Sequence, residues 1–488
     1  MIYSAAIPTE MNTATISHLL RSDRQEDLCF GLWHPSQGRN RLSALLWKVL
    51  LPRAGEREVH GNVSFNPGYF ERALRLAVKN KSGLLFMHSH MGPGWQGMSS
   101  DDIRAEQRIS AAVKGATGLP LVGLTLGTDN SWSARFWIKT APHTYARRWC
   151  QSVRVVGDCL RVTYNDNLIP RPHFREELSR TESAWGPEEQ SHLMRLHVGV
   201  IGAGSVGSMV GEALARMGVA HVSLIDFDTV KLVNLDRLLN AHRRDAILQR
   251  SKVAVLGRAI AASATAQPFT VEKLEWSISE EEGVRSALDC DVLFSCVDRP
   301  WPRSILNFIA YAHLIPVVDG GIRLERKSSG KGLLRADWRA QVVGPSRPCL
   351  ECLGQYSSGD AATDRDGYYD DPSYIANLPG DHPIKTNANV FGFSLSVAAL
   401  EVEQFLALIL QMPAGIIHHP QAYHFVTSCL DSSESNCLST CMFPGLVGLG
   451  DHAPISLTAP HHVAVESRTE RLRFRRSIRY WMGLLMAR

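Results

Sequence analysis

The sequence predicts two domains of different class: an α+β domain followed by a doubly wound α/β domain. Between residues 10 and 165, short apolar runs typical of strands outnumber the helical patterns and do not alternate with them, which favours an α+β unit. From Leu196 a strand, a glycine-rich turn, a helix and a second strand follow one another, which predicts a βαβ unit with parallel strands. The length of 488 residues also exceeds the roughly 100–200 residues of one typical domain.

The apolar pattern places the expected elements. In the first domain, strands are expected at 28–33, 43–51, 83–90, 119–127 and 134–140, and helices at 68–80 and 100–114. In the second, strands are expected at 198–201, 221–226, 291–297 and 315–321, with a helix at 208–218 and a polar, turn-rich loop at 355–387. The predicted boundaries are 1–164 for the first domain, 165–190 for a linker and entry helix, 191–445 for the second domain, and 446–488 for a basic C-terminal tail.

Composition excludes several classes of protein. A hydrophobic fraction of 44% and a charged fraction of 20% are those of a globular protein, not of a disordered chain, a collagen or a coiled coil. The net charge of +4 is too small to predict a nucleic-acid partner. The longest apolar stretch, from Phe391, contains Glu401 and Glu403, which we expect on the water-facing side of a helix and not in a membrane. The N-terminus lacks the pattern of a secretory signal, so we expect a cytoplasmic protein.

Two histidines near residue 90 predict a metal site. His88 and His90 lie at the end of an expected strand, where alternate residues face the same side and can reach one cation. After a glycine-rich loop, Ser99 is the expected N-cap of a helix, which places Asp102 in its first turn. Two imidazoles and one carboxylate leave a fourth position open on zinc, as a catalytic site requires. Glu26, in the segment QEDLCF (25–30) that is expected to begin the first strand, adds a further carboxylate.

This segment resembles the JAMM motif of the JAB/MPN metallopeptidase family: an upstream Glu, His-x-His, a spacer, and Ser-x-x-Asp. The resemblance implies an α+β JAB/MPN-like fold with His88, His90 and Asp102 as ligands of a catalytic zinc. It also implies Glu26 as the general base and Ser99 as a group that stabilises the oxyanion. The spacer before Ser99 is one residue longer than is usual in the family, which leaves Asp101 as a second candidate for the third ligand.

A glycine-rich loop near residue 204 predicts a nucleotide site. Gly202, Gly204 and Gly207 follow a strand and open a helix, where a phosphate can approach the backbone. Asp226 closes the next strand, at the position of a ribose-binding acid. These features alone favour an NAD-dependent dehydrogenase. An ordered series of charged and polar residues argues instead for a triphosphate with magnesium; the series consists of Asp226, Asp228, Asn234, Arg237, Lys252 and Asp298.

This series resembles the ThiF-type adenylyltransferases, which include the activating enzymes of ubiquitin-like proteins. The resemblance implies a Rossmann-like fold, ATP and magnesium, with Asp226 on the ribose and Asp298 positioning the metal. It implies that Arg237 and Lys252 contact phosphates, and that Arg180, on an entry helix ending at Gly186, reaches the triphosphate across a homodimer interface. The reaction implied is attack of a carboxylate on the α-phosphate, which gives an acyl-adenylate and pyrophosphate.

Ten cysteines are too few for a disulfide scaffold in a chain of this length. Cys349 and Cys352 form a CxxC pair, and Cys437 and Cys441 form a second close pair. By resemblance to the same family these four residues hold a structural zinc. Residues 353–428 contain no cysteine, so the sequence identifies no thioester-forming residue, although Cys429 or a member of the two pairs could serve. Cys290 and Cys296 bracket an expected buried strand and are predicted to be core residues.

Together the resemblances imply a protein that processes and activates a ubiquitin-like protein ending in glycine. The first domain would cleave after that glycine, and the second would adenylate the freed carboxylate. One alternative is an adenylyltransferase for a sulfur carrier, small molecule or peptide, with an accessory JAB domain. A second alternative is a nonenzymatic scaffold with vestigial sites.

Overall fold

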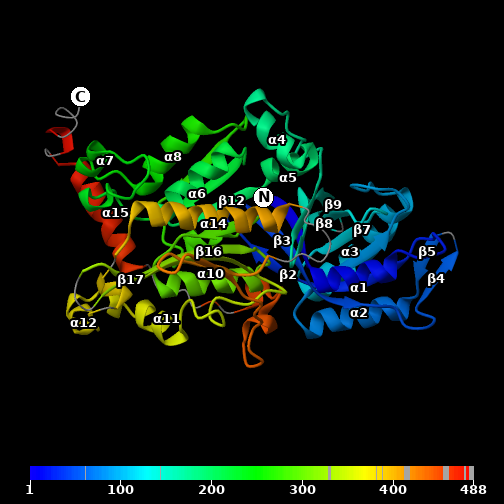
Figure 1. Ribbon diagram of the computed structural model, residues 1–488. Helices are drawn as coiled ribbons and strands as arrows, with labels where there is room; N and C mark the ends of the chain where they lie inside the picture. Colours follow the sequence, from blue (N-terminus) through cyan, green and yellow to red (C-terminus); the bar gives the residue numbers. More distant parts are fainter. Residues whose placement is uncertain are drawn as a thin grey trace. The chain divides into compact units, whose positions relative to one another are not determined.

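The computed structural model describes residues 1–60, 62–142, 144–327, 331–380, 382–386, 388–410, 418–453, 455, 461–477 and 480–482. Its contacts divide the chain into two compact units (Figure 1). Unit 1 comprises Met1–Arg171, Tyr311–Leu314 and Met442–Pro454; unit 2 comprises Pro172–Ala310, Ile315–Cys441 and Ile455–Arg488. Each unit therefore consists of several separate segments of the chain. The predicted domains, with boundaries after residues 164, 190 and 445, were each one continuous segment.

Unit 1 is built on one mixed sheet. In spatial order its strands are β11 (Leu160–Tyr164), β10 (Ser152–Val156), β1 (Ile2–Pro8), β3 (Arg41–Leu50), β2 (Leu28–Gln37), β6 (Gly83–Ser89), β7 (Leu121–Leu126), β8 (Trp132–Ala141) and β9 (Thr144–Trp149). A separate hairpin joins β4 (Arg57–His60) and β5 (Asn62–Phe65). The expected strands are all present, as β2, β3, β6, β7 and β8, but the sequence analysis did not predict β1, β4, β5, β9, β10 and β11.

Helices cover both faces of this sheet, as the alternation in β6 shows. Leu84 and Phe86 belong to a core with residues of α2 (Pro67–Lys79) and α3 (Ser100–Thr117). Leu85 and Met87 belong to a second core that contains Leu19, the last residue of α1 (Thr9–Leu19). Because neighbouring strand residues face opposite sides, α1 packs on one face of the sheet and α2 and α3 on the other. Unit 1 thus combines one mixed sheet with helices on both of its faces.

Unit 2 contains the predicted parallel sheet. In spatial order its strands are β14 (Thr270–Leu274), β13 (His221–Ile225), β12 (His197–Ile201), β15 (Val292–Ser295), β16 (Val317–Arg326), β17 (Leu333–Val343), β18 (Gln421–His424) and β19 (Cys429–Ser432). The first five are parallel and the last three extend the sheet antiparallel. The chain adds strands first to one side of β12 and then to the other, so the order reverses between β12 and β15. Ligands of such sheets bind at this reversal, at the carboxyl ends of the strands.

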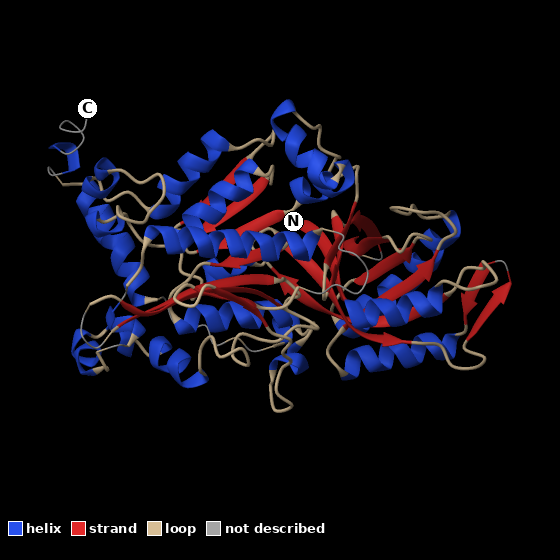
Figure 2. Cartoon of the chain, in the orientation of Figure 1, coloured by secondary structure: helices blue, strands red, loops and turns tan. Residues whose placement is uncertain are grey.

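Helices connect and cover the strands of unit 2 (Figure 2). They are α4 (Ser179–Trp185), α5 (Pro187–Arg195), α6 (Ser205–Arg216), α7 (Arg243–Ile247), α8 (Lys252–Ser263), α9 (Glu281–Ala287), α10 (Pro300–Ala312), α11 (Ser358–Arg365), α12 (Pro372–Asn377), α13 (Pro383–Thr386), α14 (Phe391–Ile409) and α15 (His462–Arg475). Short 3₁₀ turns at Glu176–Leu178, Leu232–Asn234, Tyr368–Asp370, Phe443–Leu446 and Gly450–His452 complete the described elements.

Three expectations for unit 2 were wrong. The described residues of the segment 355–387 form a series of short helices and not a loop, and Arg299 forms ion pairs with Asp364 and Asp370 of this segment. The C-terminal segment carries α15, whose contacts are described below. Glu403 is exposed as expected, but Glu401 is fully buried and not on the water-facing side of α14.

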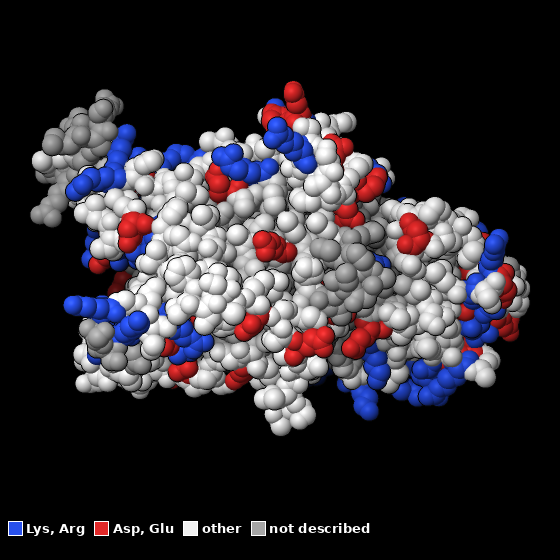
Figure 3. All heavy atoms as spheres, in the orientation of Figure 1, with Lys and Arg blue, Asp and Glu red and all other residues white. Residues whose placement is uncertain are grey.

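Among the described residues, α14 is the helix that is long and apolar enough to cross a membrane. However, 56% of its most apolar 18-residue stretch is buried inside the protein. On the face that Figure 3 shows, basic and acidic side chains are interspersed, in keeping with 52 basic and 48 acidic residues in the whole chain.

Candidate functional site

The first candidate site lies in unit 1, at the carboxyl end of β6. His88 is on the α3 side of the sheet, by the same alternation that buries Phe86 there, and His90 follows two residues later. Their Nε2 atoms lie 3.2 Å apart. The Nε2 of His88 is 3.5 Å from one carboxylate oxygen of Asp102, and that of His90 is 3.3 Å from the other. The structure therefore brings together the three residues that the sequence predicted as ligands.

A capping box at the start of α3 orients Asp102. The hydroxyl of Ser99 accepts a hydrogen bond from the Asp102 N–H (3.1 Å), and the Asp102 carboxylate accepts one from the Ser99 N–H (2.7 Å). Burial works to raise the pKa of Asp102, but the hydrogen bond from His90 and the charge of His88 hold that pKa well below its usual value. Asp101, by contrast, pairs with Arg104, and its side chain is 64% exposed. Asp102, not Asp101, is thus the third candidate ligand.

Glu26 was predicted to lie within a strand, but it lies two residues before β2 begins. The register between β2 and β6 still brings it to this site. Leu28 pairs with His88 in the antiparallel ladder of β2 and β6, and the Ser89 N–H donates to the Asp27 carbonyl (3.0 Å). If this register continues one residue beyond the Asp27–Ser89 pair, Glu26 lies opposite His90, and the two side chains share one face of the sheet. Burial raises the pKa of Glu26; the charge of Asp102 also raises it, whereas His90 lowers it.

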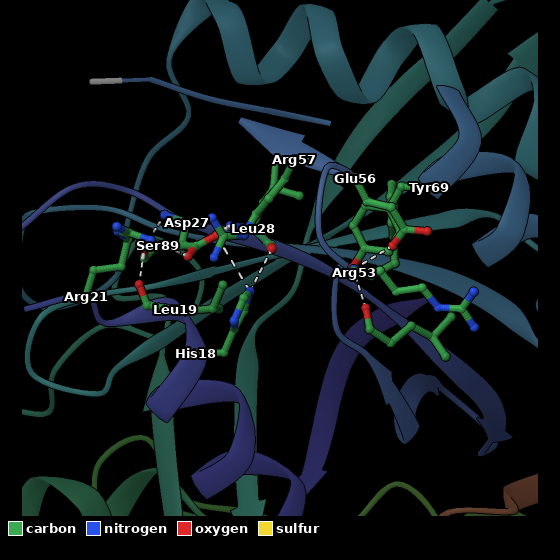
Figure 4. A network of polar contacts seen from close by, with 12 residues as sticks. His18, Leu19, Arg21, Asp27, Leu28, Arg53, Glu56, Arg57, Tyr69 and Ser89 are labelled. Atoms are coloured by element: carbon green, nitrogen blue, oxygen red, sulfur yellow. Dashed lines mark hydrogen bonds and ion pairs between the residues drawn. The ribbon is translucent and has the colours of Figure 1, made fainter. Parts of the chain in front are cut away.

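A buried polar network fixes the residue next to Glu26 (Figure 4). The Asp27 carboxylate is 1% exposed and lies 3.0 Å from Arg57 Nε and 3.3 Å from Arg21 Nη1. The Asp27 N–H donates to the Ser89 hydroxyl (3.0 Å), which in turn donates to the Leu19 carbonyl (2.9 Å). Because Ser89 stands between the two histidines, this network ties Glu26 and the histidines to one rigid piece of backbone. Sequence reasoning missed Asp27, since a lone acid at a strand start has no distinguishing pattern.

A second buried network supports His88. Arg135 and Glu106 are both fully buried and form an ion pair, and Trp137 Nε1 donates to Glu106 Oε2 (2.5 Å). Arg135 also donates to the Thr125 hydroxyl (2.5 Å), which lies 3.4 Å from His88 Nε2. Burial, and then the charge of Arg135, lower the pKa of His88 to about 3, so its imidazole is neutral and able to bind a metal.

The donor set fits zinc. Two imidazole nitrogens and one carboxylate oxygen all lie within 4.8 Å of one another, and these are the atom types that open zinc sites use.

The second candidate site lies in unit 2, at the reversal in strand order. A cavity of about 1470 Å³ opens there, lined by residues that follow β12, β13, β14 and β15. Gly202 has φ +95°, and a Cβ on it would lie 2.5 Å from the Cys296 carbonyl oxygen. A Cβ on Gly207 would lie 1.9 Å from the Gly202 carbonyl oxygen. No atom of the described residues lies within 4 Å of a Cβ on Gly204, the N-cap of α6. The loop is thus packed against neighbouring backbone at Gly202 and Gly207 and open at Gly204, as phosphate binding at a helix N-terminus requires.

The predicted acids form a connected set with Lys252. Asp226 Oδ2 accepts from the Ala203 N–H of the glycine loop (2.7 Å), and Oδ1 accepts from the Asp228 N–H (2.7 Å). Lys252 Nζ lies 2.7 Å from Asp228 Oδ2. Burial alone would lower the pKa of Lys252, but the charges of Asp226, Asp228 and Asp298 raise it above its usual value. Lys252 is therefore a permanent cation in the cavity wall.

The remaining predicted residues divide into two groups. Asn234, Arg237 and Asp298 line the same cavity, and the Arg237 guanidinium donates to the Val233 carbonyl (2.8 Å). Arg180 does not line it; it is exposed on α4. The expected role of Arg180 across a homodimer interface stays a prediction.

Two arginines in the cavity wall had no sequence signal. Arg303 and Arg339 both line the cavity, and each donates to buried Asp319 (2.8 Å). Burial works to raise the pKa of Asp319, but these two arginines hold it below its usual value. Cys296, expected in the core, also lines the cavity; burial raises the pKa of its thiol, which lies 3.7 Å from Glu401 Oε2. Cys290 is buried as expected, and Cys429 is exposed and does not line the cavity.

The four cysteines predicted to bind a metal converge. The sulfur atoms of Cys349, Cys352, Cys437 and Cys441 all lie within 4.8 Å of one another. Backbone N–H groups point at these sulfurs: that of Cys349 lies 3.2 Å from Cys437 Sγ, and that of Leu438 lies 3.4 Å from Cys352 Sγ. Such donors stabilise thiolates, so the donor set fits a closed, four-cysteine zinc site.

Comparisons with known proteins concern the second unit. The ThiF family matches residues 178–436. The molybdopterin-synthase adenylyltransferase of Escherichia coli K12 is 26% identical over 175 residues, 36% of this chain and 65% of that protein. The SAMP-activating enzyme E1 of Haloferax volcanii is 28% identical over 174 residues, 34% of this chain and 57% of that protein. The tRNA threonylcarbamoyladenosine dehydratase of Bacillus subtilis 168 is 45% identical over 65 residues, 13% of this chain and 26% of that protein. The chain thus spans less than two thirds of the length of each of these relatives.

We predict two zinc sites of different lability. The full-length protein should carry two zinc ions, and mild chelation should remove only the one at His88, His90 and Asp102, because a closed thiolate site contributes directly to folding. Cys352→Ser should lose the resistant zinc and His90→Ala the labile one, as measured by atomic emission on the same preparations. Substoichiometric resistant zinc, with all four thiols readily alkylated, would contradict the four-cysteine site.

We also predict that the Arg135–Glu106 pair is essential for stability. Arg135→Met leaves Glu106 buried without its cation and should cost about 3–5 kcal/mol of unfolding free energy. The matched control Arg104→Met breaks an exposed pair and should change stability by less than about 1 kcal/mol. Urea unfolding of both variants measures the difference. Equal stabilities would show that the buried pair contributes no more than the exposed one.

Proposed function

The chain belongs to the ThiF family, and on that premise we propose that unit 2 adenylates the C-terminal carboxylate of a ubiquitin-like or sulfur-carrier protein, using ATP and magnesium. One observation carries the proposal. The cavity at the reversal in strand order is lined by the glycine loop, by Asp226 at the position expected for a ribose-binding acid, by the cations Arg237 and Lys252, and by Asp298. The names of two relatives, a molybdopterin-synthase adenylyltransferase and a SAMP-activating enzyme, agree with it.

In this proposal each residue acts by binding or by charge. The α6 N-terminus and Gly204 receive phosphate oxygens, and Asp226 accepts hydrogen bonds from the ribose hydroxyls. Lys252 and Arg237 neutralise the triphosphate, and Asp228 and Asn234 hold these cations and their loop in place. Asp298 would hold magnesium, which when bound screens the charge on the phosphates. Arg180 of a second copy would add a further cation.

The reaction needs no general base. A carboxylate oxygen of the carrier forms a bond to the α-phosphorus of ATP, and the bond from that phosphorus to the bridging oxygen breaks. Pyrophosphate leaves with the electron pair, and the carrier becomes an acyl-adenylate. Because the carboxylate is already ionised at neutral pH, this chain contributes positioning and charge stabilisation.

Two other functions remain as alternatives. A small-molecule or peptide adenylyltransferase would use the same cavity without a protein carrier. A scaffold with vestigial sites would retain the fold without exchange of pyrophosphate. Exchange that requires a protein ending in glycine separates the main proposal from both.

We propose a second activity for unit 1, that of a zinc peptidase acting after the C-terminal glycine of the same carrier. The convergence of His88, His90 and Asp102, with Glu26 on the same face, carries this proposal. Zinc bound there would supply Lewis-acid chemistry. Glu26 would take the proton of the attacking water and pass it to the leaving amine, and the Ser99 hydroxyl would donate to the developing oxyanion.

The two proposals are chemically linked, because cleavage frees the carboxylate that adenylation consumes. A homodimer, a cytoplasmic location, and the absence of nucleic-acid and membrane partners remain predictions from the sequence.

We predict that wild-type protein catalyses ATP–pyrophosphate exchange only with magnesium and a carrier ending in a free glycine carboxylate. Asp298→Ala should lower the exchange rate by on the order of 100-fold or more, because the site loses the carboxylate that would hold magnesium. Asp366→Ala, a partly exposed acid outside the cavity, should leave exchange unchanged. Reduction of NAD, with no exchange for any carrier tested, would refute the adenylation proposal.

We predict that Glu26→Gln keeps the labile zinc and loses cleavage by about 10²–10⁴-fold, the usual contribution of a general base. The substrate is a ubiquitin-like protein with a short peptide after its terminal glycine. Glu58→Gln, at an exposed acid of β4, should cleave at the wild-type rate, and pyrophosphate exchange should persist in both variants. Wild-type cleavage by Glu26→Gln would show that Glu26 is not the base.

A further inference from the structure

The C-terminal helix α15 is fastened to the loops at the carboxyl edge of the unit 2 sheet. It lies beyond residues 178–436, the segment that matches the ThiF family. The Ser467 hydroxyl donates to the Phe227 carbonyl (3.2 Å). Arg468 donates to both carboxylate oxygens of Glu280 (2.8 and 2.6 Å), a side chain that is 3% exposed. A two-pronged contact to a buried carboxylate fixes the position of this helix.

These contacts reach the loops that follow β13 and β14. Phe227 directly follows the ribose-position acid Asp226. Arg468 also donates to the Glu275 carbonyl (3.2 Å), and its guanidinium carbon lies 4.5 Å from the centroid of the Trp276 ring. Arg471, which is 4% exposed, forms an ion pair with Glu275. The helix is therefore anchored beside the part of the cavity that lies next to the ribose position.

The wall of the cavity changes character there. Charged residues line the expected phosphate position, whereas aromatic and apolar residues gather here; these are Phe227, Trp276, Ile278, Trp301, His461 and Val463. The ion pair of Arg299 with Asp370 also lines the cavity close to His461. The His461 ring lies 5.3 Å from Phe227 and 6.1 Å from Trp301, centroid to centroid, in edge-to-face contacts. Flat apolar walls of this kind suit a planar heterocycle and not a phosphate.

His461 also has an unused hydrogen-bonding atom. Its Nδ1 is buried and has no hydrogen-bond partner in the described part of the chain. Buried polar atoms of this kind are rare and point to a ligand or bound water. Burial lowers the pKa of His461, so its imidazole is neutral and offers one N–H donor and one acceptor. Adenine presents both kinds of group on its edge.

We propose that α15 and its preceding residue His461 complete the base end of the nucleotide site, with His461 hydrogen-bonded to adenine. The inference rests on the proposed function and deepens it, since it assigns base recognition to an element outside the family-matching segment. Selection of adenine over other bases thus depends on the C-terminal helix, whereas binding of the triphosphate depends on the glycine loop and its cations.

Calorimetric titration of the full-length protein with ATP, GTP and inorganic tripolyphosphate, without carrier, tests this. His461→Ala should raise the Kd for ATP about tenfold or more, the effect expected when a buried hydrogen bond is lost, and should leave the Kd for tripolyphosphate unchanged. The neighbouring His462 is exposed, and His462→Ala is the matched control, with a Kd for ATP within twofold of the wild type. Wild-type preference for ATP over GTP should shrink in His461→Ala only.

Each contrary result has a separate meaning. An unchanged Kd for ATP in His461→Ala would overturn the inference and leave the adenylation proposal intact. Equal weakening of ATP and tripolyphosphate would overturn it as well, because the effect would not concern the base. A wild type that binds neither ATP nor tripolyphosphate would refute the adenylation proposal itself.

Discussion

The parallel alignment of β12, β13, β14 and β15 is the constraint on which the candidate nucleotide site depends. Since parallel strands end at one edge of the sheet, residues separated by up to a hundred positions meet there. Gly202, Asp226, Trp276 and Asp298 follow four different strands and line one cavity. The order of the strands also decides where the cavity opens, because the chain departs to opposite sides after β12 and β15.

In unit 1 the corresponding constraint is register. A shift of one residue between β2 and β6 would turn Glu26 away from His90 and place it on the other face of the sheet. Two features oppose such a shift. The Ser89 N–H donates to the Asp27 carbonyl while the Asp27 N–H donates to the Ser89 hydroxyl, and the Asp27 carboxylate is buried between Arg21 and Arg57. The charged network of Figure 4 thus has a positional role although none of its side chains is a candidate ligand.

Local patterns predicted what depends on neighbouring residues. The His-x-His spacing, the Ser99 cap with Asp102, the glycine loop and the CxxC pair all act within a few positions, and the structure brings each together as expected. What sequence reasoning missed depends on pairing over distance. Arg339 reaches Asp319 because β16 and β17 pair antiparallel, and Glu401 is buried because α14 packs on that same strand pair. His461 lies in a segment that composition alone describes as a basic tail. None of these contacts can be predicted from a local sequence pattern.

The central claim is that a carrier's carboxylate attacks the α-phosphorus of ATP in unit 2. The most direct measurement uses a carrier whose terminal glycine carboxylate is labelled with ¹⁸O, followed by release with hydroxylamine and mass spectrometry of the nucleotide. The account predicts AMP that carries one ¹⁸O atom, because the carboxylate oxygen stays on phosphorus when the acyl bond is broken. Unlabelled AMP, or ADP with inorganic phosphate, would contradict it.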